Sequence, residues 1–560
     1  MKFQFTRSVA LVGVAVLGLG ACIDLDERVV SGVTADYFET PEGLRDAVEA
    51  AYNGLYGHYA QERHFAMQEY GIDIWAMGAD GSHKQWNLYD QRLNATTAYA
   101  NDQWNASYQA INAANAAISR AAALEGGMSD EEKNRLVAEA RFLRALFYFH
   151  LVRHYGAVHV TLEETQGVIT EAHRTPEAEV YSQVIIPDLE FAIANLPLEQ
   201  EVYGRVTRGA AQHLLAVVYL TRLADGDPAR AEALAKEVIN SGVYQLQPSY
   251  QELWDIENIE NSEMIFTVQS SGDPLTWGSG NRWHLYWNMT YDGEPGMTRT
   301  LEYGRPWRRV RPSAFFMDSL FNRAADSRYL DSFRFVWYAN FEPTMPEGMQ
   351  LGDTAIFLAQ VKTSELDRDL YCNKKYVIYT EPDDFWNPKS RPLGDACPAL
   401  KGEYNTSTFP VMLKHVDPLR PAVNTEEGRR DFPVYRLAET YLLAAEAIIR
   451  QGERLDEAAE FVNAVRRRAA RPGHEAEMEV TAADMTLDLI LDERARELYA
   501  EGHRWFDLKR FGKLVEMVRR RNHEAAPNIQ DFHVLRPIPQ SQIDRTRNED
   551  GSEFGQNPGY

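Results

Sequence analysis

The sequence predicts a mainly α-helical fold, in which helical pairs stack as a tetratricopeptide-like scaffold and carry a large, irregular, loop-rich insertion. Two observations predict the scaffold. Apolar residues recur at steps of three and four in long segments, and these segments come in pairs separated by short glycine-containing turns. A third observation predicts the insertion, because the helical rhythm fails between residues 246 and 429, where Trp, Tyr, Gly and Pro are abundant. A generic all-α bundle is the alternative interpretation of the helical pairs.

The helices are placed by their apolar periodicity and by the residues at their ends. Pro41 fits the first turn of the first helix, and Ser129 with Glu132 three residues later predicts a capping box for the third. The expected helices cover approximately residues 40–56, 102–125, 129–155, 207–224, 228–241, 434–451, 455–470, 484–501 and 503–518. The helical scaffold is expected mainly at 40–56, 102–245 and 430–520. The irregular binding region is expected mainly at 57–101 and 246–429. Short strands are expected near 264–269 and 375–379.

The N-terminus has the features of a bacterial lipoprotein signal peptide. Lys2 and Arg7 give a short positive region, and an apolar stretch of about 12 residues follows, which is shorter than the roughly 20 residues that a transmembrane helix needs. This stretch ends in Leu19-Gly20-Ala21-Cys22, the pattern of a lipobox. We therefore expect residues 1–21 to be removed and Cys22 to be acylated at the start of a body that spans 22–560. An ordinary signal peptide with a chance cysteine is the alternative.

Cysteine usage and charge limit the classes of function. Cys372 and Cys397 are the cysteines that remain after Cys22, and an even pair in an exported protein predicts a disulfide. No CxxC motif or mixed Cys/His cluster is present, so neither a zinc ion nor another cofactor is expected. The formal net charge of -24 disfavours nucleic acid as a partner, because nucleic-acid binding depends on neutralising phosphates.

Four stretches together match the pattern of a known family. They are Ala138–Ala145, Arg208–Ala211 with Val238–Tyr244, Tyr435–Leu442 with Asn463–Arg466, and Asp492–Arg510 with the closing Gln556–Tyr560. Because these stretches occur in order along nearly the whole chain, the sequence resembles the SusD/RagB family of outer-membrane nutrient-binding lipoproteins. In that pattern, Trp505 and Phe506 are core residues of the last helical pair.

This resemblance implies four tetratricopeptide-like units that support a more variable ligand-binding half. It also implies a lipid-anchored protein of the outer membrane, not an enzyme, that faces the cell exterior and lies like a lid on a TonB-dependent (SusC-like) transporter barrel. Oligosaccharides are the usual cargo of the family, with peptides in some members. We therefore expect binding of an oligosaccharide or peptide nutrient and its delivery to the transporter. A protein-interaction scaffold and a surface glycoside hydrolase are the alternatives.

Two clusters of aromatic residues in the loop-rich regions are the candidate ligand contacts. The first cluster contains Trp75, Trp86 and Tyr89, and the second contains Trp277, Trp283, Tyr286, Trp287, Tyr291 and Trp307. Flat aromatic faces pack against the CH-rich faces of sugar rings, while a few polar groups around an apolar wall orient the ligand. The predicted ligand contacts are Trp75, Trp86, Tyr89, Trp277, Trp283 and Trp287, with Asp73, Asp80, Asn87, Asn281 and Arg282 as polar partners. The alternative is that these rings pack the insertion or contact a protein partner.

Two charged segments need separate interpretations. Glu493 and Glu497 lie four residues apart on one helix face, a spacing that acid–base catalysis can use. The neighbouring Arg494 and Arg496 favour salt bridges between helices instead. The basic stretch Arg305–Arg311 either meets an acidic ligand or is paired within the protein. Since no GxSxG, HExxH, Walker or strand-linked GxGxxG motif is present, no catalytic residue is predicted.

We predict that Cys22 is the first residue of the mature protein and that it carries acyl chains, because the lipobox directly follows a short apolar stretch. Mass spectrometry of the protein isolated from its native membrane should find a lipid-modified Cys22 at the N-terminus. A Cys22→Ala variant should lose both the modification and the membrane attachment. An unmodified mature protein that begins at another residue would contradict the prediction.

Overall fold

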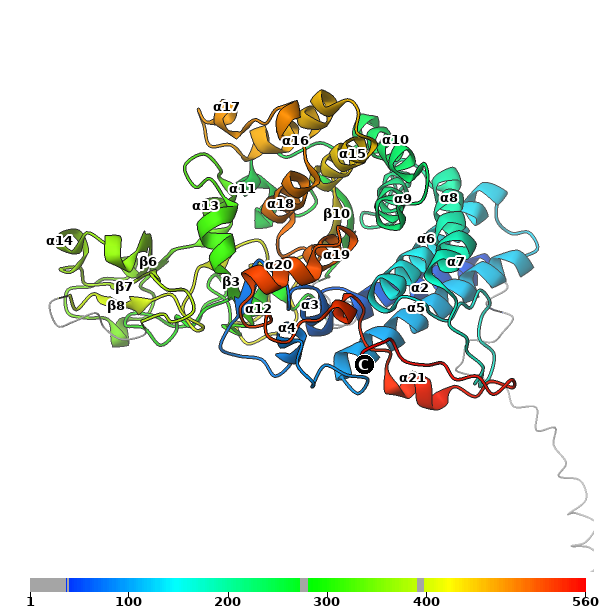
Figure 1. Cartoon of the computed structure of the whole chain (residues 1–560), viewed down its shortest axis with the longest axis horizontal. Helices are drawn as coiled ribbons and strands as arrows, with labels where there is room; N and C mark the ends of the chain where they lie inside the picture. The colour runs from blue at the N-terminus through cyan, green and yellow to red at the C-terminus, as the bar shows by residue number, and fades with distance from the viewer. Residues whose placement is uncertain (1–36, 38–39, 272–279, 390–396) are drawn as a thin grey trace, which may run out of the picture.

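The computed structural model describes residue 37 and residues 40–271, 280–389 and 397–560, which form two halves (Figure 1). One half is a stack of helices, and the other is a loop-rich region with small sheets, at the left of the view. The mainly helical class that the sequence predicts is confirmed. The signal segment with Cys22, and also Trp277, lie outside the described residues. None of the described helices combines the length and the apolar character that crossing a membrane requires.

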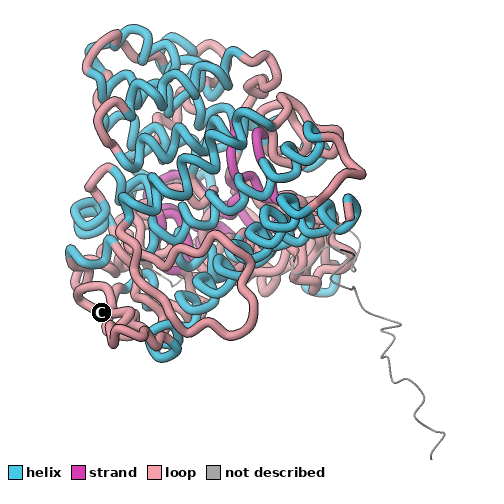
Figure 2. The backbone as a smooth tube through the Cα atoms, turned by 90° about the vertical axis from the view of Figure 1, so that its right-hand side faces the viewer, coloured by secondary structure: helices cyan, strands magenta, loops and turns pink. Residues whose placement is uncertain are grey.

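The helical half is built from helices that pack in sequence order. Its long members are α2 (Pro41–His58), α5 (Ala98–Ala123), α6 (Asp130–Tyr155), α8 (Ile186–Asn195), α9 (Arg208–Arg222), α10 (Asp227–Asn240), α15 (Leu437–Gln451), α16 (Leu455–Ala469), α18 (Leu487–Leu498), α19 (Arg504–Arg510) and α20 (Leu514–Arg521). Helix α2 packs on α5, α5 on α6, α6 on α8, α8 on α9, α9 on α10, α10 on α15, and α15 on both α16 and α18. Figure 2 shows these helices as cyan coils stacked side by side. The predicted helical pairs are confirmed. The last predicted helix divides into α19 and α20, and α8 is an addition.

Shorter helices lie between these elements and in the loop-rich half. They are α3 (Glu62–Gln68), α4 (Gln85–Leu88), α7 (Glu177–Val180), α11 (Tyr250–Leu253), α12 (Trp283–Tyr286), α13 (Arg328–Asp331), α14 (Arg368–Tyr371), α17 (Glu475–Met478) and α21 (Gln540–Arg545). Several of them fall in the two regions that the sequence predicts to be irregular. Helices of one or two turns have no stability of their own, so these regions depend on packing against the scaffold.

Polar side chains that precede a helix satisfy the free N–H groups of its first turn. Thr40 Oγ1 accepts a hydrogen bond from the N–H of Gly43 at 3.1 Å, and Ser129 Oγ accepts one from the N–H of Glu132 at 3.2 Å. The predicted capping box at the start of α6 is only half formed. The Glu132 carboxylate instead accepts a hydrogen bond from Arg45 at 2.7 Å, which connects the start of α6 to α2.

The strands of the described residues form small sheets. They are β1 (Trp75–Met77), β2 (Met264–Val268), β3 (Val310–Pro312), β4 (Phe333–Arg334), β5 (Val336–Tyr338), β6 (Thr354–Lys362), β7 (Val377–Glu381), β8 (Leu400–Glu403), β9 (Val411–Met412) and β10 (Phe432–Arg436). Antiparallel pairs form between β1 and β3, β2 and β10, and β4 and β9, while β5–β6–β7–β8 is a mixed sheet with β6, β7 and β8 parallel. The predicted strands correspond to β2 and β7. The helix predicted to begin at residue 434 begins at Leu437, because the preceding residues pair with β2.

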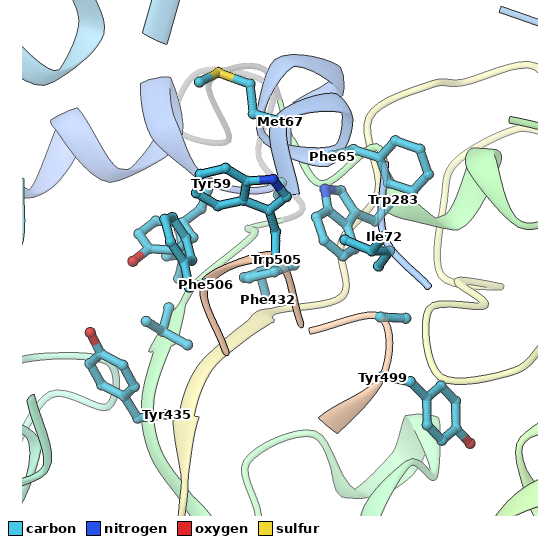
Figure 3. Packing of buried hydrophobic residues seen from close by; sticks show 14 of the residues in the cluster. Tyr59, Phe65, Met67, Ile72, Trp283, Phe432, Tyr435, Tyr499, Trp505 and Phe506 are labelled. Atoms are coloured by element: carbon cyan, nitrogen blue, oxygen red, sulfur yellow. The ribbon is translucent and has the colours of Figure 1, made fainter. Parts of the chain in front are cut away.

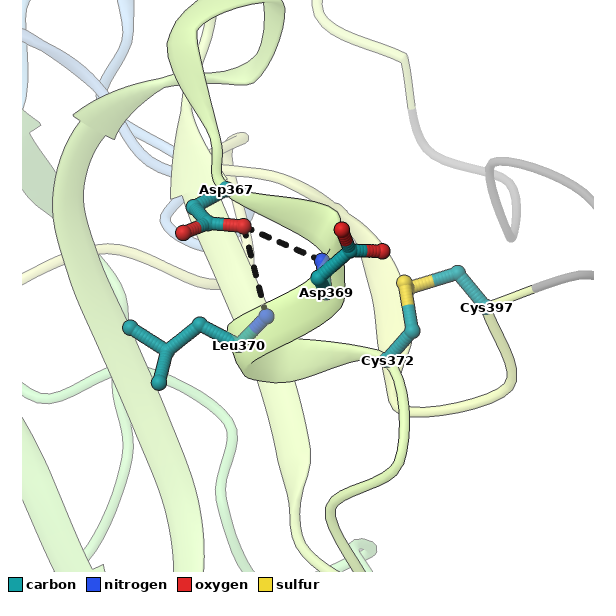
Figure 4. Close-up of a disulfide and its surroundings, with 5 residues drawn as sticks. All are labelled: Asp367, Asp369, Leu370, Cys372 and Cys397. Atoms are coloured by element: carbon teal, nitrogen blue, oxygen red, sulfur yellow. Dashed lines mark hydrogen bonds between the residues drawn. A yellow bond between two sulfur atoms is a disulfide. The ribbon is translucent and has the colours of Figure 1, made fainter.

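The loop-rich half contains the predicted disulfide (Figure 4). Cys372 directly follows α14, its sulfur is bonded to that of Cys397, and the two Cα atoms are 4.4 Å apart. Both cysteines are buried in a small apolar cluster with side chains of β6, β7 and β8, separate from the main core. Asp367 caps α14 by accepting hydrogen bonds from the N–H groups of Asp369 and Leu370. The disulfide therefore fixes the end of α14 to the mixed sheet.

Aromatic side chains from both halves meet in the main core (Figure 3). Trp505 and Phe506 of α19 are buried, and Trp505 Nε1 donates a hydrogen bond to the hydroxyl of Tyr89 at 3.2 Å. Trp283, from the loop-rich half, packs on Phe432 in a T-shaped arrangement with the ring centroids 4.7 Å apart. The expectation that Trp505 and Phe506 are core residues is confirmed.

A buried network of charges connects the two halves. Glu497 of α18 accepts hydrogen bonds from Arg328 of α13 at 3.0 Å and from Arg436 of β10 at 2.6 Å, and it also pairs with Arg468 of α16. Burial alone would raise the pKa of Glu497, but the three arginines outweigh it and lower this pKa to about 2. Glu493 pairs with Arg328 at 2.8 Å, and arginines likewise overcome burial and lower its pKa. The structural interpretation of Glu493 and Glu497 is therefore confirmed, since both are ionised and paired.

Glu497→Ala should lower the free energy of unfolding by about 3–5 kcal/mol, because the substitution leaves three buried arginines without the carboxylate that they share. Glu460→Ala is the matched control, since the Glu460 side chain is 66% exposed beside Arg467 on α16 and should not change the midpoint of unfolding measurably. Urea unfolding followed by far-UV circular dichroism measures both variants. Equal midpoints for the two variants would contradict the stabilising role of the network.

Several histidines are buried in the protein interior, away from the solvent that stabilises a charged ring. They are His58, His64, His150, His154, His284 and His415. Burial lowers the pKa of every one of these rings, to about 3 for His64, His284 and His415. Burial acts in the opposite sense on Glu69 and Asp431, because it raises the pKa of each carboxyl group to about 7.

The protein should lose stability when the pH falls from about 6.5 to about 4.5. The unfolded chain protonates these six histidines below pH 6.5, whereas the folded protein keeps them neutral, so acid favours the unfolded state. Glu69 and Asp431 act in the opposite direction, because the folded state takes up their protons between about pH 7 and 4.5. Over all the described groups, seven carboxyl groups have a raised pKa and ten histidines have a lowered one, so the histidines outweigh the carboxyl groups. Melting temperatures measured across this range should fall with pH, and a constant or rising value would contradict the assignment.

Candidate ligand-binding surface

The aromatic residues that the sequence singles out as ligand contacts are core residues in the structure. Trp75, Trp86, Tyr89, Trp283 and Trp287 are each at most 3% exposed, and Tyr286 and Tyr291 are fully buried. Trp75, for example, packs between Trp287 and Phe316, with both pairs of ring centroids 5.0 Å apart. A buried ring offers no face on which a sugar can stack, so we correct the prediction for these positions. Their role in the structure is to pack the loops against the scaffold.

The predicted polar partners divide into two groups. Asp73, Asn87 and Asn281 are buried, and each is hydrogen-bonded within the protein. For these three residues the predicted ligand contact does not fit, because their polar atoms already have partners. Asp80 and Arg282 are half-exposed and lie in or beside a single open surface.

We call this open area the Trp307 surface. Its members are half-exposed side chains from α3, from the loop after β1, from the start of α5, and from the loops before β3 and β10. They are Glu62, Asp80, His83, Tyr99, Arg305, Trp307, Arg308, Arg309 and Glu426. Direct contacts connect them, although the segments are far apart in the sequence. Arg282 lies at the edge, 3.8 Å from Glu426.

Main-chain hydrogen bonds fix the loop that carries Trp307. The N–H of Arg309 donates to the carbonyl of Tyr286 at 2.9 Å, and the N–H of Gly78 donates to the carbonyl of Arg309 at 3.0 Å. The two loops approach so closely at Gly78 that a Cβ atom there would lie 2.1 Å from the carbonyl oxygen of Arg308. Only glycine fits this approach, so Gly78 allows the loop with Asp80 and the loop with Trp307 to lie side by side.

Trp307 is the half-exposed ring at the centre of this surface. The guanidinium of Arg309 lies 4.7 Å from the ring centroid and that of Arg305 lies 5.5 Å from it. The buried ring of Tyr286 lies beneath, with the centroids 5.9 Å apart. Cation–π contacts of this kind orient the indole, while part of it stays accessible to solvent. Trp307 is therefore only partly buried, unlike Trp75, Trp86, Trp283 and Trp287, the predicted tryptophans within the described residues.

Each arginine of the Trp307 surface has a carboxylate partner. The ion pairs are Arg309–Glu62 at 2.7 Å, Arg308–Asp80 at 2.5 Å and Arg305–Glu426 at 3.0 Å. Three positive and three negative charges therefore cancel over this area. This pairing confirms, for these three residues, the interpretation that the basic stretch is paired within the protein. The surface consequently offers many hydrogen-bonding groups but no net charge.

A second flat element borders the surface, where His83 stacks on Tyr99 with ring centroids 3.8 Å apart. Burial lowers the pKa of His83, so its ring is neutral near pH 7. Burial, together with the charge of Glu62, raises the pKa of Tyr99, so its hydroxyl group remains protonated. His83, Tyr99 and Glu62 are not among the predicted contacts. The polar run of Gly, Asp, Ser and Lys around His83 is the signal in the sequence that marks an exposed loop.

Two hollows lie away from this surface within the described part of the chain. One is a pocket of about 200 Å³ between residues 198–207 and β2, and the other is a groove of about 400 Å³ between α2 and α5. The pocket is lined by polar and apolar side chains in similar measure, and the groove by Ala, Gly, two amides and Tyr56. Neither combines an open indole with compensated charges, so we take the Trp307 surface as the candidate site. The described residues contain no group of three His, Cys, Asp or Glu side chains placed to hold a metal ion.

Comparison with known proteins matches two parts of the chain to family models. Residues 393–560 match the SusD family, and residues 36–220 match a family described as starch-binding and associating with the outer membrane. SusD-like protein P2 of Formosa agariphila is 27% identical, with the whole of both chains covered. The starch-binding protein SusD of Bacteroides thetaiotaomicron is 26% identical over 78% of this chain and 74% of its own length.

Solved structures show the same fold. A laminarin-binding SusD-like protein has a TM-score of 0.65 at 22% identity, covering 93% of this chain and 100% of that one. Surface glycan-binding protein A from Bacteroides thetaiotaomicron, solved in complex with laminarihexaose, has a TM-score of 0.68 at 20% identity, covering 92% of this chain and 99% of that one. The arrangement of helices and loops described above is therefore shared with proteins of this kind.

Proposed function

The chain belongs to the SusD/RagB family, and on this basis we propose that it captures oligosaccharides at the outer membrane and delivers them to a TonB-dependent transporter. It is a SusD-like surface glycan-binding protein associated with the outer membrane. SusD-family glycan-binding proteins are non-catalytic, so the chain is not an enzyme. The lipid anchor at Cys22, the transporter partner and the identity of the cargo are parts of the proposal.

The observation that carries the saccharide proposal is the composition of the Trp307 surface. A sugar ring has apolar CH faces and uncharged hydroxyl groups around its edge. The half-exposed indole of Trp307 matches the first property, and the three internally compensated ion pairs match the second, since they donate and accept hydrogen bonds without net charge. Starch and laminarin, which appear in the names of similar proteins, are neutral glucans of this chemistry.

A peptide is the alternative cargo, and the charges of the surface disfavour it. The free ends of a peptide carry charges that need a partner of opposite sign. On the Trp307 surface, Arg305, Arg308 and Arg309 each already have a carboxylate partner. Binding of a charged end would therefore cost the energy of an existing ion pair, whereas binding of a hydroxyl group would not. A neutral oligosaccharide is thus the better fit.

Trp307→Ala should weaken glycan binding by about 5- to 150-fold, because the loss of one stacking ring costs roughly 1–3 kcal/mol by analogy with base–aromatic stacking. The measurement is affinity gel electrophoresis against neutral polysaccharides, starting with laminarin and soluble starch, followed by calorimetric titration with oligosaccharides of the polymer that is retained. The melting temperature of the variant verifies that it is folded and should fall only modestly, because the ring packs at the edge of the main core and not inside it.

Two controls separate the site from the core. Tyr338→Ala removes a ring that is 51% exposed in the same half but lies outside the Trp307 surface, and it should leave binding unchanged. Trp283→Ala should instead destabilise the protein by about 3–5 kcal/mol, as expected for a large buried ring. Normal binding by Trp307→Ala would place the site elsewhere, and no glycan binding by the wild type would refute the proposed function.

The native protein should copurify with a large outer-membrane barrel when cells are extracted with mild detergent. This prediction depends on membership of the family, because transporter delivery needs a lasting contact between the two proteins. Tagged wild-type protein, followed by mass spectrometry of the proteins retained, provides the measurement. Trp307→Ala should retain the barrel, since the substitution removes only the proposed glycan contact. Recovery of the chain alone, with and without glycan, would argue against the partner.

A further inference from the structure

A second aromatic pair lies apart from the Trp307 surface, where the loop after β7 meets the end of α20. The ring of Trp386 stacks on that of His523 with the centroids 4.7 Å apart and an angle of 14° between the planes. Trp386 is half-buried and His523 is exposed. Trp386 packs against the edge of the main core, but neither residue belongs to the site described above.

The loop after β7 fixes Trp386 in position. One carboxylate oxygen of Asp384 accepts a hydrogen bond from the N–H of Trp386 at 3.0 Å, and the other accepts one from the side chain of Asn387 at 2.9 Å. Phe385 is buried, contacts the Trp386 ring in a T-shaped arrangement at 4.7 Å, and lies 4.0 Å from the guanidinium of Arg311. The indole therefore loses little conformational freedom when a ligand binds.

The residues on either side fix His523 in the same way. The Asn522 side chain is buried and donates a hydrogen bond to the carbonyl of Ile72 at 2.9 Å. The Glu524 carboxylate accepts a hydrogen bond from the N–H of Met77 at 2.9 Å. Both contacts are to the β1 segment, which leads directly into the loop of the Trp307 surface. The two aromatic sites are thus held on one continuous piece of structure.

These contacts also bound the distance between the two sites. From Arg309, the path runs through its hydrogen bond with Gly78 to the adjacent Met77, and then through Glu524 to the adjacent His523. Two hydrogen-bonded contacts and two steps of about 3.8 Å between neighbouring Cα atoms place His523 within on the order of 20 Å of Arg309. A glycan chain of several units is long enough to contact both sites.

The surroundings of the pair, like the Trp307 surface, offer polar groups beside a flat ring. The amide of Asn387 and the carboxylate of Asp384 supply hydrogen-bonding groups beside the rings, and Lys389 pairs with Asp383 at 3.3 Å. We infer that Trp386 and His523 form a second saccharide-binding platform, which contacts the more distant units of a long neutral glycan bound at the Trp307 surface. This inference rests on the proposed function and extends it to the length of the ligand.

The test compares a polymer with a short oligosaccharide of the same sugar. The probes are laminarin and laminaritriose, or soluble starch and maltotriose if starch is the polymer retained. Trp386→Ala should weaken polymer binding about tenfold and leave trisaccharide binding unchanged, whereas Trp307→Ala should weaken both. His523→Ala should weaken polymer binding to a lesser degree. Trp386→Phe, which keeps a flat ring, should restore most of the polymer affinity.

Leu370→Ala is the matched surface control, because Leu370 is 53% exposed in the same half and should bind both probes like the wild type. Melting temperatures verify that every variant is folded. Wild-type polymer affinity in both Trp386→Ala and His523→Ala would overturn the second platform alone. A wild-type protein that binds no glycan would overturn the proposed function and the platform together. Loss of the copurifying barrel in Trp386→Ala, with unchanged polymer affinity, would assign the pair to a protein contact and overturn the inference.

Discussion

The fold depends on one buried carboxylate that several parts of the chain must reach at once. Glu497 of α18 meets arginines from α13, β10 and α16 in the interior. An arginine does not lose its proton in a protein, so each of these side chains needs its negative partner wherever solvent is excluded. The loop-rich half therefore has one position on the helical scaffold in which all the charges are paired. Apolar packing stabilises the same arrangement, but it selects one orientation of the loop-rich half less strictly than paired charges do.

This constraint explains how a surface can form from segments that are distant in the sequence. The helices contribute only Glu62 of α3 and Tyr99 of α5 to the Trp307 surface, yet they determine where its loops begin and end. Short strand pairs then set the finer spacing, because β1 and β3 place the loop with Asp80 against the loop with Trp307. The close approach at Gly78 has no room for a side chain and completes this arrangement. Precision at the site thus comes from backbone contacts rather than from long rigid elements.

The helical pairs could be predicted from the sequence, because a repeating apolar pattern reports directly on which face of a helix is buried. The ligand contacts could not be predicted in the same way. Whether a tryptophan in a loop-rich region is exposed or buried depends on how the loops pack on one another. The local sequence still holds some information. Trp283 and Trp287 are neighbours of the apolar Leu285 and are buried, whereas Trp307 is followed directly by Arg308 and is half-exposed. The predicted start of α15 is three residues too early, because the apolar residues of β10 continue the helical pattern without a turn.

The pairing of every arginine on the Trp307 surface has a consequence for the medium in which the protein works. A protein at the cell surface meets whatever salt concentration its surroundings have, and added ions screen attraction between exposed charges over distances of about 10 Å or less. A site that held its ligand by unpaired charge would weaken and strengthen with each change of salinity. Stacking and uncharged hydrogen bonds are nearly indifferent to ionic strength. On the proposed function, a surface whose charges cancel in place would therefore hold a neutral glycan equally well in dilute and in saline water.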